Sequence, residues 1–373
     1  MQAEKRKNMG LQCGIIGITN IGKTTIFNCI SDNKVETSNF AFSTNKSNLG
    51  QIKVPDPRLK KIDDLIHSAK IIPTSLEIID IPGLTKGSSK GEGVGNSFLS
   101  DIRNCDALIH VVRCFDDPNL VHIDVSVDAV RDKETIDLEL QVKDLDSIEK
   151  RIQKWEKLFR TGDKKAIPAI ESLRKVQDHL EGFQNLRTLE LSDFDMEIIS
   201  DMFLLTLKPV IYVCNVDESS AVDGNHYVKE VIESVKGEDS EVLVIAGQME
   251  AEISELEEED DRISFLSDIG LEEPGVNKLI RSAYHLLNLQ TFFTAGPKEI
   301  RAWTIKQGMT APYAAGVIHS DLQRGFIRAE VMKYDDFINL GSESACRDAG
   351  KLSIEGKNYI VGDGDILHIR FNV

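Results

Sequence analysis

Short apolar runs alternate with helical stretches over the first third of the sequence. In chain order these segments are residues 11–18, 23–31, 76–81 and 107–112, of which the second is helical. Such alternation is typical of βαβ units that build a mostly parallel sheet. Apolar strand signal returns only at residues 209–214 and 241–246. We therefore expect an α/β fold in which a long insertion interrupts the sheet.

The insertion is helical. Between Arg113 and Pro209 lie 209 − 113 − 1 = 95 residues, whereas a crossover between parallel strands needs only about 10–12. Apolar residues recur there at helical spacing in two stretches separated by a Thr-Gly-Asp break at residues 161–163. They are Leu138, Val142, Leu145, Ile148, Ile152, Trp155 and Phe159, then Ile167, Ile170, Leu173, Val176 and Leu180. Either the two helices pair as an antiparallel coiled-coil hairpin, or the stripe packs on the parent domain.

The last part of the chain changes character. From about residue 292, short β runs alternate with glycine turns, and the chain ends in a strand, a turn and a strand over residues 359–371. This pattern predicts a separate small α+β domain. The predicted boundaries place the sheet domain in residues 10–130 and 208–290, the helical insertion in residues 131–207, and the last domain in residues 291–373.

Charge and cysteine content narrow the class of protein. The 373 residues carry 44 Lys and Arg against 61 Asp and Glu, a net charge of −17, and residues 292–373 are neutral with ten of each sign. An acidic chain disfavours non-specific binding to DNA or to an anionic membrane. The acidic run at residues 250–261 is interpreted as a solvated helix face. The six cysteines form no CxxC pair, and no apolar run is long enough to span a membrane. We expect a cytoplasmic monomer.

A phosphate-binding loop occupies residues 17–24, Gly-Ile-Thr-Asn-Ile-Gly-Lys-Thr, between an apolar run and a helical stretch. Its glycines let backbone N–H groups surround the β-phosphate, and the following helix N-terminus adds a favourable dipole. The Lys23 side chain is expected to reach the β- and γ-phosphates, and the Thr24 hydroxyl to bind Mg²⁺. The predicted nucleotide-binding residues of this element are Asn20, Ile21, Gly22, Lys23, Thr24 and Thr25.

Further phosphate-site residues follow along the chain. Asp80 ends an apolar strand and Gly83 comes three residues later. The carboxylate is predicted to hold Mg²⁺, and the Gly83 amide to meet the γ-phosphate. Thr44 lies in a polar stretch and is predicted to complete the magnesium shell. The glycine-rich residues 86–95 are typical of a mobile loop that a γ-phosphate orders.

The base-binding element follows the next strand as Asn215-Val-Asp-Glu218, where translation-factor-like GTPases have NKxD. Val216 replaces the Lys that packs on the base, and Glu218 replaces the Asp that pairs with guanine. The longer carboxylate cannot occupy the same place, and adenine lacks the guanine donors. Asn215 and backbone groups are therefore left to read the base, and guanine selectivity should be weakened.

These motifs resemble those of the YchF/Obg-like ATPase family. The resemblance covers residues 10–373, and its most specific segments are residues 86–96, 215–218, 291–296 and 301–304. It implies a preference for ATP over GTP and a P-loop NTPase domain of the G type. It also implies that the insertion is a coiled-coil arm and that residues 292–373 are a TGS domain, a ubiquitin-like β-grasp module. Family members bind ribosomes, so the ribosome and ribosomal RNA are the expected partners.

The hydrolytic step needs a group that orients water. Regulatory GTPases place a Gln just after the DxxG element, but Leu84 stands there. The family resemblance makes His122 the candidate, and Asn20 resembles the Asn that marks potassium-dependent members, so K⁺ is a second possible cofactor beside Mg²⁺. The leading hypothesis is an ATP-hydrolysing switch. The alternatives are a GTP-dependent ribosome-assembly GTPase and a ribosome or RNA adaptor whose hydrolysis is incidental.

Overall fold

The computed structural model describes residues 11–31, 47–83, 87, 94–120, 122–256 and 258–372. They form two compact units, the first made of Met1–Gln51 and Glu77–Leu279, the second of Ile52–Leu76 and Ile280–Val373. This division departs from the predicted boundaries in two places. Residues 52–76 and 280–290 were both expected in the first domain, yet they cluster with the C-terminal part of the chain. Residues 52–76 do so because α3 (Arg58–Ile66) and β3 (Ile71–Ile72) lie against β9 (Ile300–Lys306). The units are described separately.

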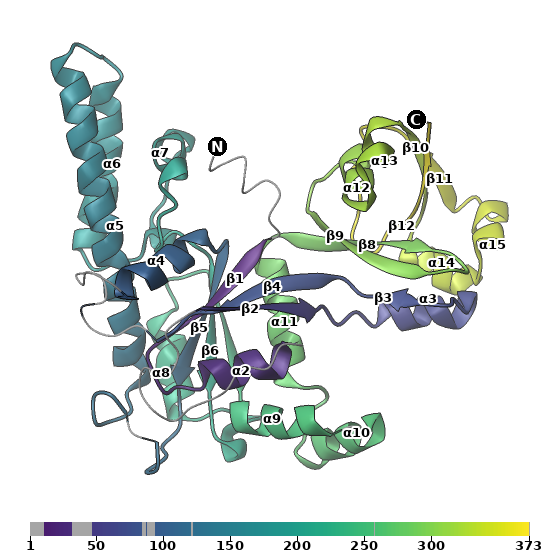
Figure 1. Ribbon diagram of the computed structural model, residues 1–373, viewed down its shortest axis with the longest axis horizontal. Coiled ribbons are helices and arrows are strands. Elements are labelled where there is room, and N and C mark those ends of the chain that lie inside the picture. Colours follow the sequence, from purple (N-terminus) through teal and green to yellow (C-terminus); the bar gives the residue numbers. More distant parts are fainter. Residues whose placement is uncertain are drawn as a thin grey trace. The chain divides into compact units, whose positions relative to one another are not determined.

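The first unit is built on a six-stranded sheet in the order β2-β4-β1-β5-β6-β7 (Figure 1). The strands are β1 (Gln12–Ile16), β2 (Asn48–Lys53), β4 (Ser75–Asp80), β5 (Ala107–Arg113), β6 (Val210–Asn215) and β7 (Glu241–Ile245). From β4 to β7 all neighbours are parallel, which confirms the mostly parallel sheet. The central strands β1, β5 and β6 are buried along their whole lengths, as a sheet covered on both faces requires.

Helices follow most of the strands, so the functional loops gather at the carboxyl edge of the sheet. These helices are α2 (Lys23–Ile30), α4 (Val94–Asn104), α8 (His226–Ser234), α9 (Gly247–Glu255) and α10 (Glu259–Asp268). The boundary between the units falls within α11 (Gly275–Leu286). Helix α2 packs against α9. A core of apolar side chains from the ends of β5 and β6 is covered by α8, α9 and α10. None of the described helices is long and apolar enough to cross a membrane.

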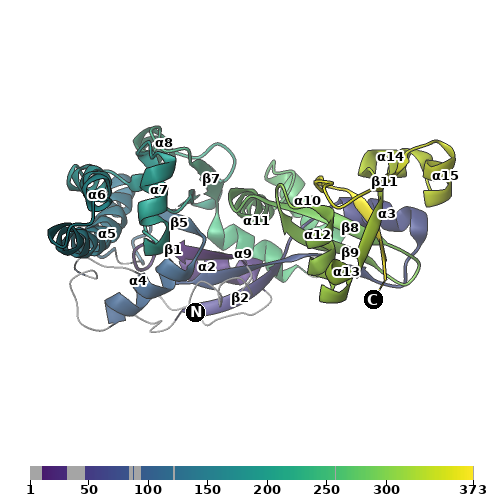
Figure 2. The ribbon, with the colours of Figure 1, turned by 90° about the horizontal axis from the view of Figure 1, so that it is seen from above.

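The insertion between β5 and β6 forms a helical hairpin of α5 (Ala129–Arg160) and α6 (Ala166–Glu181), followed by α7 (Asp193–Ile199). Figures 1 and 2 show α5 and α6 lying side by side. Both expected packings occur in one helix. The second half of α5 contributes Ile148 and Ile152 to a core shared with α6, whereas Ile136 and Leu140 in the first half are buried against the rest of the unit.

Three residues of the predicted apolar stripe lie outside the core. Leu138 is 42% exposed, Phe159 is 50% exposed and Ile167 is 49% exposed. The core face in the first half of α5 instead includes Lys133 and Asp137. Counting apolar residues alone missed this face because part of it is charged.

A buried ionic network fixes the base of the arm. Lys133 and Arg187 both contact Asp137, at 2.9 Å and 3.3 Å, and Arg187 binds Glu238 at 2.7 Å. The hydroxyl of Tyr212 on β6 donates to Glu238 at 2.7 Å. Burial alone would raise the pKa of Asp137, but Arg187 and Lys133 hold it below its usual value. Breaking such a network leaves an uncompensated buried charge, so the hairpin is attached rigidly to the sheet strand that ends at the base-binding element.

The second unit contains a six-stranded mixed sheet in the order β11-β10-β12-β8-β9-β3. Its strands are β3 (Ile71–Ile72), β8 (Leu289–Ala295), β9 (Ile300–Lys306), β10 (Phe326–Met332), β11 (Leu352–Glu355) and β12 (Ile366–Phe371). The helices are α3 (Arg58–Ile66), α12 (Ala311–Ile318), α13 (Ser320–Arg324), α14 (Tyr334–Leu340) and α15 (Glu343–Asp348). This is the small α+β arrangement expected from the sequence.

Two cores lie on opposite faces of this second sheet. Phe292 belongs to the core under α12, and its neighbour Phe293 belongs to the core that α3, α14 and α15 cover, as the two-residue period of a strand requires. Leu59 and Ile62 of α3 supply part of the second core. Residues 52–76 are therefore a structural part of this unit.

Candidate phosphate and base site

The phosphate loop joins β1 to α2 through three residues with positive φ. These are Gly17 at 146°, Asn20 at 59° and Gly22 at 90°. Gly22 is the N-cap of α2, and a side chain there would collide with the Asn215 amide nitrogen. The loop thus needs glycine at that position for both backbone and space. This conformation directs the first amides of α2 toward the place where an anion binds.

Lys23 is held within the loop. Its ammonium nitrogen Nζ donates a hydrogen bond of 2.5 Å to the carbonyl oxygen of Ile18, and the side chain is 7% exposed. Burial lowers the pKa of Lys23 to about 8, against the opposing effect of Asp80. A nearby phosphate would stabilise the charged form of this buried lysine. Lys23 is therefore suited to bind an anion.

Thr24 and Asp80, the two predicted magnesium ligands in the described residues, lie in contact. The Thr24 hydroxyl donates to Oδ2 of Asp80 at 2.9 Å. The other carboxylate oxygen, Oδ1, is buried and has no hydrogen-bond partner among the described residues. Burial raises the pKa of Asp80, opposed by Lys23 and Thr24. Because an unpaired buried carboxylate oxygen is costly and Mg²⁺ prefers oxygen ligands, these residues fit a magnesium ion.

Gly83 lies directly against the phosphate loop. A Cβ at this position would come within 2.6 Å of Thr19 Cγ2 and 2.8 Å of the Thr19 backbone nitrogen. The backbone after Asp80 can approach this closely only as glycine. The Gly83 position therefore suits an amide that meets the same polyphosphate as the loop. The hydroxyl of Thr19 itself is buried without a hydrogen-bond partner in the described part of the chain.

Asn215, predicted to read the base, makes two contacts that the sequence did not predict. Its side chain is buried, and each amide atom is bonded to one backbone group, while Nδ2 carries two N–H donors. Nδ2 donates to the carbonyl oxygen of Ile21 at 2.8 Å, and Oδ1 accepts from the amide of Gly247 at 2.9 Å. Asn215 therefore ties the phosphate loop to the segment after β7.

Of the other residues in the base-binding element, Val216 lies in the core, and Asp217 and Glu218 lie at the surface. Val216 is buried in the core beneath α8 and α9. The Asp217 carboxylate accepts from the Ser219 hydroxyl at 2.6 Å and from the Ser220 amide at 3.0 Å, so it caps a 3₁₀ helix, η3 (Glu218–Ser220). Glu218 is exposed. Asp217 accepts both of these bonds through Oδ1 and is exposed as well.

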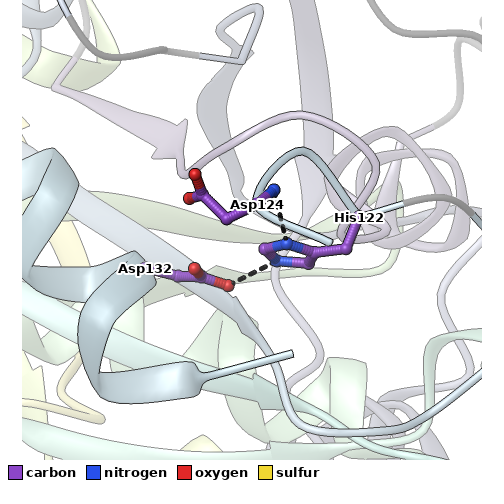
Figure 3. A group of neighbouring side chains, drawn as sticks. All are labelled: His122, Asp124 and Asp132. Atoms are coloured by element: carbon purple, nitrogen blue, oxygen red, sulfur yellow. Dashed lines mark hydrogen bonds and ion pairs between the residues drawn. The ribbon is translucent and has the colours of Figure 1, made fainter. Parts of the chain in front are cut away.

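His122 lies in a buried cluster rather than on an open loop (Figure 3). Its Nδ1 accepts a hydrogen bond from the Asp124 amide at 3.1 Å, and Nε2 lies 2.8 Å from Oδ2 of Asp132. Since Nδ1 is an acceptor here, the proton belongs on Nε2, which donates to the Asp132 carboxylate. To reach a nucleotide, His122 would first have to break both hydrogen bonds.

Some predicted residues lie outside the described part of the chain. These are Thr44, Leu84 and most of the glycine-rich residues 86–95. Within that segment Gly87 is described, and its amide donates to Oε1 of Glu139 at 2.6 Å. Glu139 belongs to α5 and is buried. Sequence reasoning missed both Glu139 and Gly247. Gly247 could have been found from its place after a strand adjacent to β6, because neighbouring parallel strands end at one edge.

Comparisons with known proteins agree on one family. A family model named YchF-GTPase_C, described as a protein of unknown function, matches residues 289–372, and one described as a 50S ribosome-binding GTPase matches residues 12–159. The chain is 46% identical over 365 residues to the "Ribosome-binding ATPase YchF" of Haemophilus ducreyi, covering 98% of this chain and 100% of the relative. The protein of the same name from Bacillus subtilis is 45% identical over 367 residues, with the same coverage.

A solved structure extends the likeness to three dimensions. The YchF GTPase of Schizosaccharomyces pombe matches with a TM-score of 0.84 and 34% sequence identity, covering 97% of this chain and 98% of that one. The names of these relatives differ in the nucleotide, since one says GTPase and the others say ATPase.

Proposed function

The chain belongs to the YchF family, and from this premise we propose that it is a P-loop NTPase that binds ATP, hydrolyses its β–γ phosphoanhydride, and uses this cycle to control association with the ribosome. GTP is the weaker ligand in this proposal. The observation that carries it is the convergence of Lys23, Thr24, Asp80 and Gly83 at the phosphate loop. In the proposal the chain acts as a monomer.

In this proposal, different residues of the site bind the phosphates and the magnesium ion. Loop amides at the start of α2 bind the phosphates, and Lys23 moves from the Ile18 carbonyl to the β- and γ-phosphates. Asp80 and Thr24 would hold Mg²⁺, which when bound neutralises developing charge on the phosphate oxygens. The Gly83 amide senses the γ-phosphate. Thr44 is proposed as a further magnesium ligand.

The preference for ATP follows from the base-binding element. A guanine-reading acid has to accept two hydrogen bonds at a fixed place, and Asp217 is engaged in capping η3. Glu218 is one methylene longer than the usual Asp, so it cannot present its oxygens at the same distance from the backbone. Val216 is buried in the protein core and cannot cover a base as a lysine stem does. Backbone groups are then left to contact adenine.

For hydrolysis we propose that His122 leaves its contacts with Asp132 and Asp124 and positions the attacking water. His122→Ala should lower kcat while leaving the affinity for ATP within about twofold. A fall in affinity with unchanged kcat would contradict this role. We also propose K⁺ as an activating ion near Asn20, which comparison of turnover in KCl and NaCl tests.

The switch requires a path from nucleotide to arm. Gly87 lies four residues after Gly83, and its amide binds the buried carboxylate of Glu139 on α5. A γ-phosphate that orders the segment after Asp80 would therefore act on a contact with the arm. Glu139→Gln keeps the shape but weakens the acceptor. It should leave ATP affinity unchanged and reduce the difference in ribosome binding between ATP and ADP states.

Side-by-side titration with ATP and GTP tests the nucleotide assignment. We expect tighter binding of ATP, and a clear preference for GTP would favour the alternative of a ribosome-assembly GTPase.

Lys23→Ala separates the switch from an adaptor whose hydrolysis is incidental. The switch predicts loss of nucleotide-dependent ribosome binding, measured by co-sedimentation. Lys60→Ala, which removes an exposed lysine of α3, is the control. Ribosome binding by Lys23→Ala that still equals the binding of the wild type would support the adaptor.

A further inference from the structure

The tip of the helical hairpin, residues 154–167, has a charge opposite to that of the whole chain. Five cations stand against Glu156 and Asp163, so the tip carries 5 − 2 = +3 while the remaining residues carry −17 − 3 = −20. The cations are Lys154, Lys157, Arg160, Lys164 and Lys165. All five are exposed, and none forms an ion pair within the described residues. Glu156 is the one tip residue with an ion-pair partner, Arg174 at 3.7 Å.

The helix dipole accounts for Lys157 and Arg160 of the tip but not for Lys164 and Lys165. Lys157 and Arg160 lie in the last turn of α5, where a cation is stabilised by the helix dipole. Lys164 and Lys165 precede the first turn of α6, where a cation is disfavoured. Lys165 is the N-cap of α6, makes no side-chain capping bond, and has no acidic residue in the following turn. Two lysines at this end weaken the helix rather than support it.

The tip also exposes large apolar side chains. Phe159 is 50% exposed, Ile167 is 49% exposed and Leu158 is 36% exposed. Every residue from 157 to 165 is exposed, and the last buried apolar residue of α5 before the tip is Ile152. The exposed ring of Phe159 is therefore not required by the hairpin core. An aromatic ring among cations is the combination that binds unpaired nucleotides, through stacking and phosphate contacts.

The hairpin is long enough to hold its tip far from the sheet of the first unit. Helix α5 has 32 residues and so extends about 48 Å, with the tip at the end of the hairpin distant from the sheet (Figure 1). We propose that this tip is an RNA-binding surface, in which the five cations contact phosphates and Phe159 stacks on an unpaired base. The proposal rests on the proposed ribosome association and assigns its contact to ribosomal RNA. A ribosomal protein as the contacted partner is the competing outcome.

The experiment uses the full-length protein and co-sedimentation with purified ribosomes at several KCl concentrations. The test variants are Lys164→Ala/Lys165→Ala and Phe159→Ala. Lys60→Ala/Lys61→Ala is the matched control, because it also removes two adjacent exposed lysines, from α3 in the second unit. The same four proteins are then titrated with ribosomal RNA stripped of protein. Thermal unfolding checks that each variant folds.

Losing two phosphate contacts should reduce the slope of log K against log salt by about 1.4, which weakens binding roughly 25-fold at 0.1 M salt. Phe159→Ala should weaken binding between about 5-fold and 150-fold with little change in salt slope. The control should change binding at least tenfold less than the tip pair. These losses should appear with both ribosomes and stripped RNA.

Three results would overturn the proposal. Tip variants that bind ribosomes as the wild type does would exclude the tip as the contact. Losses seen with ribosomes but absent with stripped RNA would identify a ribosomal protein as the partner. Equal losses in the tip pair and the control would show a general charge effect. If the wild type failed to bind ribosomes at all, the proposed function would fail, and the stripped-RNA titration would still decide whether the tip binds RNA.

Discussion

Replacing Asn215 with Asp should weaken nucleotide binding without changing base preference. The substitution keeps the shape of the side chain and the oxygen that accepts from Gly247. It removes the donor to the Ile21 carbonyl, which lies 2.8 Å from Nδ2. A carboxylate oxygen would then face that carbonyl oxygen in a buried place. The phosphate loop would lose its tie to β6.

The expected magnitude follows from the unmade hydrogen bond. A buried acceptor left without its donor costs about 1–3 kcal/mol. If this cost falls on the ordering of the phosphate loop, the dissociation constant rises about 5-fold to 150-fold. The factor should be the same for ATP and GTP, because the loop contacts phosphates that both nucleotides share. The ratio of the two affinities should stay within about twofold.

Isothermal titration with both nucleotides measures this effect, and Asn225→Asp is its control. Asn225 also donates through Nδ2 to a backbone carbonyl, that of Cys114 at 2.7 Å, and caps α8 through its oxygen. The control should lose folding stability but keep nucleotide affinity. A tenfold change in the ATP to GTP ratio in Asn215→Asp would show that this residue reads the base. Affinities equal to those of the control would refute the tie to the loop.

Three further outcomes are expected from the site and its surroundings. Gly83→Ala should weaken nucleotide binding by tenfold or more, because the new Cβ meets the Thr19 backbone. Gly237→Ala, where a Cβ meets no atom within 4 Å, should bind as the wild type does in the same titration. Lys23 has a pKa lowered by burial to about 8, so phosphate binding between pH 8 and 9 should take up a proton. Calorimetry in two buffers of different ionisation enthalpy measures this, and equal heats would contradict it. Burial raises the pKa of Glu250 from 4.5 to about 7, so the folded protein binds more protons than the unfolded chain in this range. The free energy of unfolding should therefore fall as pH rises from about 4.5 to about 7, by up to about 3 kcal/mol. Denaturant titrations of Glu250→Gln should show no such fall, and an unchanged profile would count against the assignment.

The proximity of Lys23, Thr24 and Asp80 could be predicted because it follows from local sequence and strand order. Lys23 and Thr24 are fixed by the loop and the helix start, and Asp80 ends a strand adjacent to β1. Order along the chain and the rules of parallel sheets are enough to bring these groups together. The parallel sheet itself followed from continuous apolar runs, which mark strands buried on both faces.

Other features depended on contacts between distant segments. Asn215 also binds the Ile21 carbonyl and the Gly247 amide, and no local sequence pattern reveals these two contacts. Glu250 was expected on a solvated helix face, yet it is 2% exposed and accepts from the Gly275 amide at 2.6 Å. Most residues of an acidic run are exposed to solvent, so the run as a whole predicts exposure. Tertiary packing determines which residue of the run is buried.

The second unit combines two segments that lie far apart in the sequence, Ile52–Leu76 and Ile280–Val373. This limits the order in which the chain can fold during synthesis. Ile71 of β3 pairs with Ile300 of β9, a separation of 300 − 71 = 229 residues. Helix α3 must likewise wait for Phe293 and Ile300 before Leu59 and Ile62 have a core to enter. The hairpin, whose partners are local, can form long before this. Nascent chains should therefore carry an unfolded segment 54–74, between β2 and β4, until translation is almost complete, and a fragment that begins at residue 280 would leave part of its sheet face uncovered.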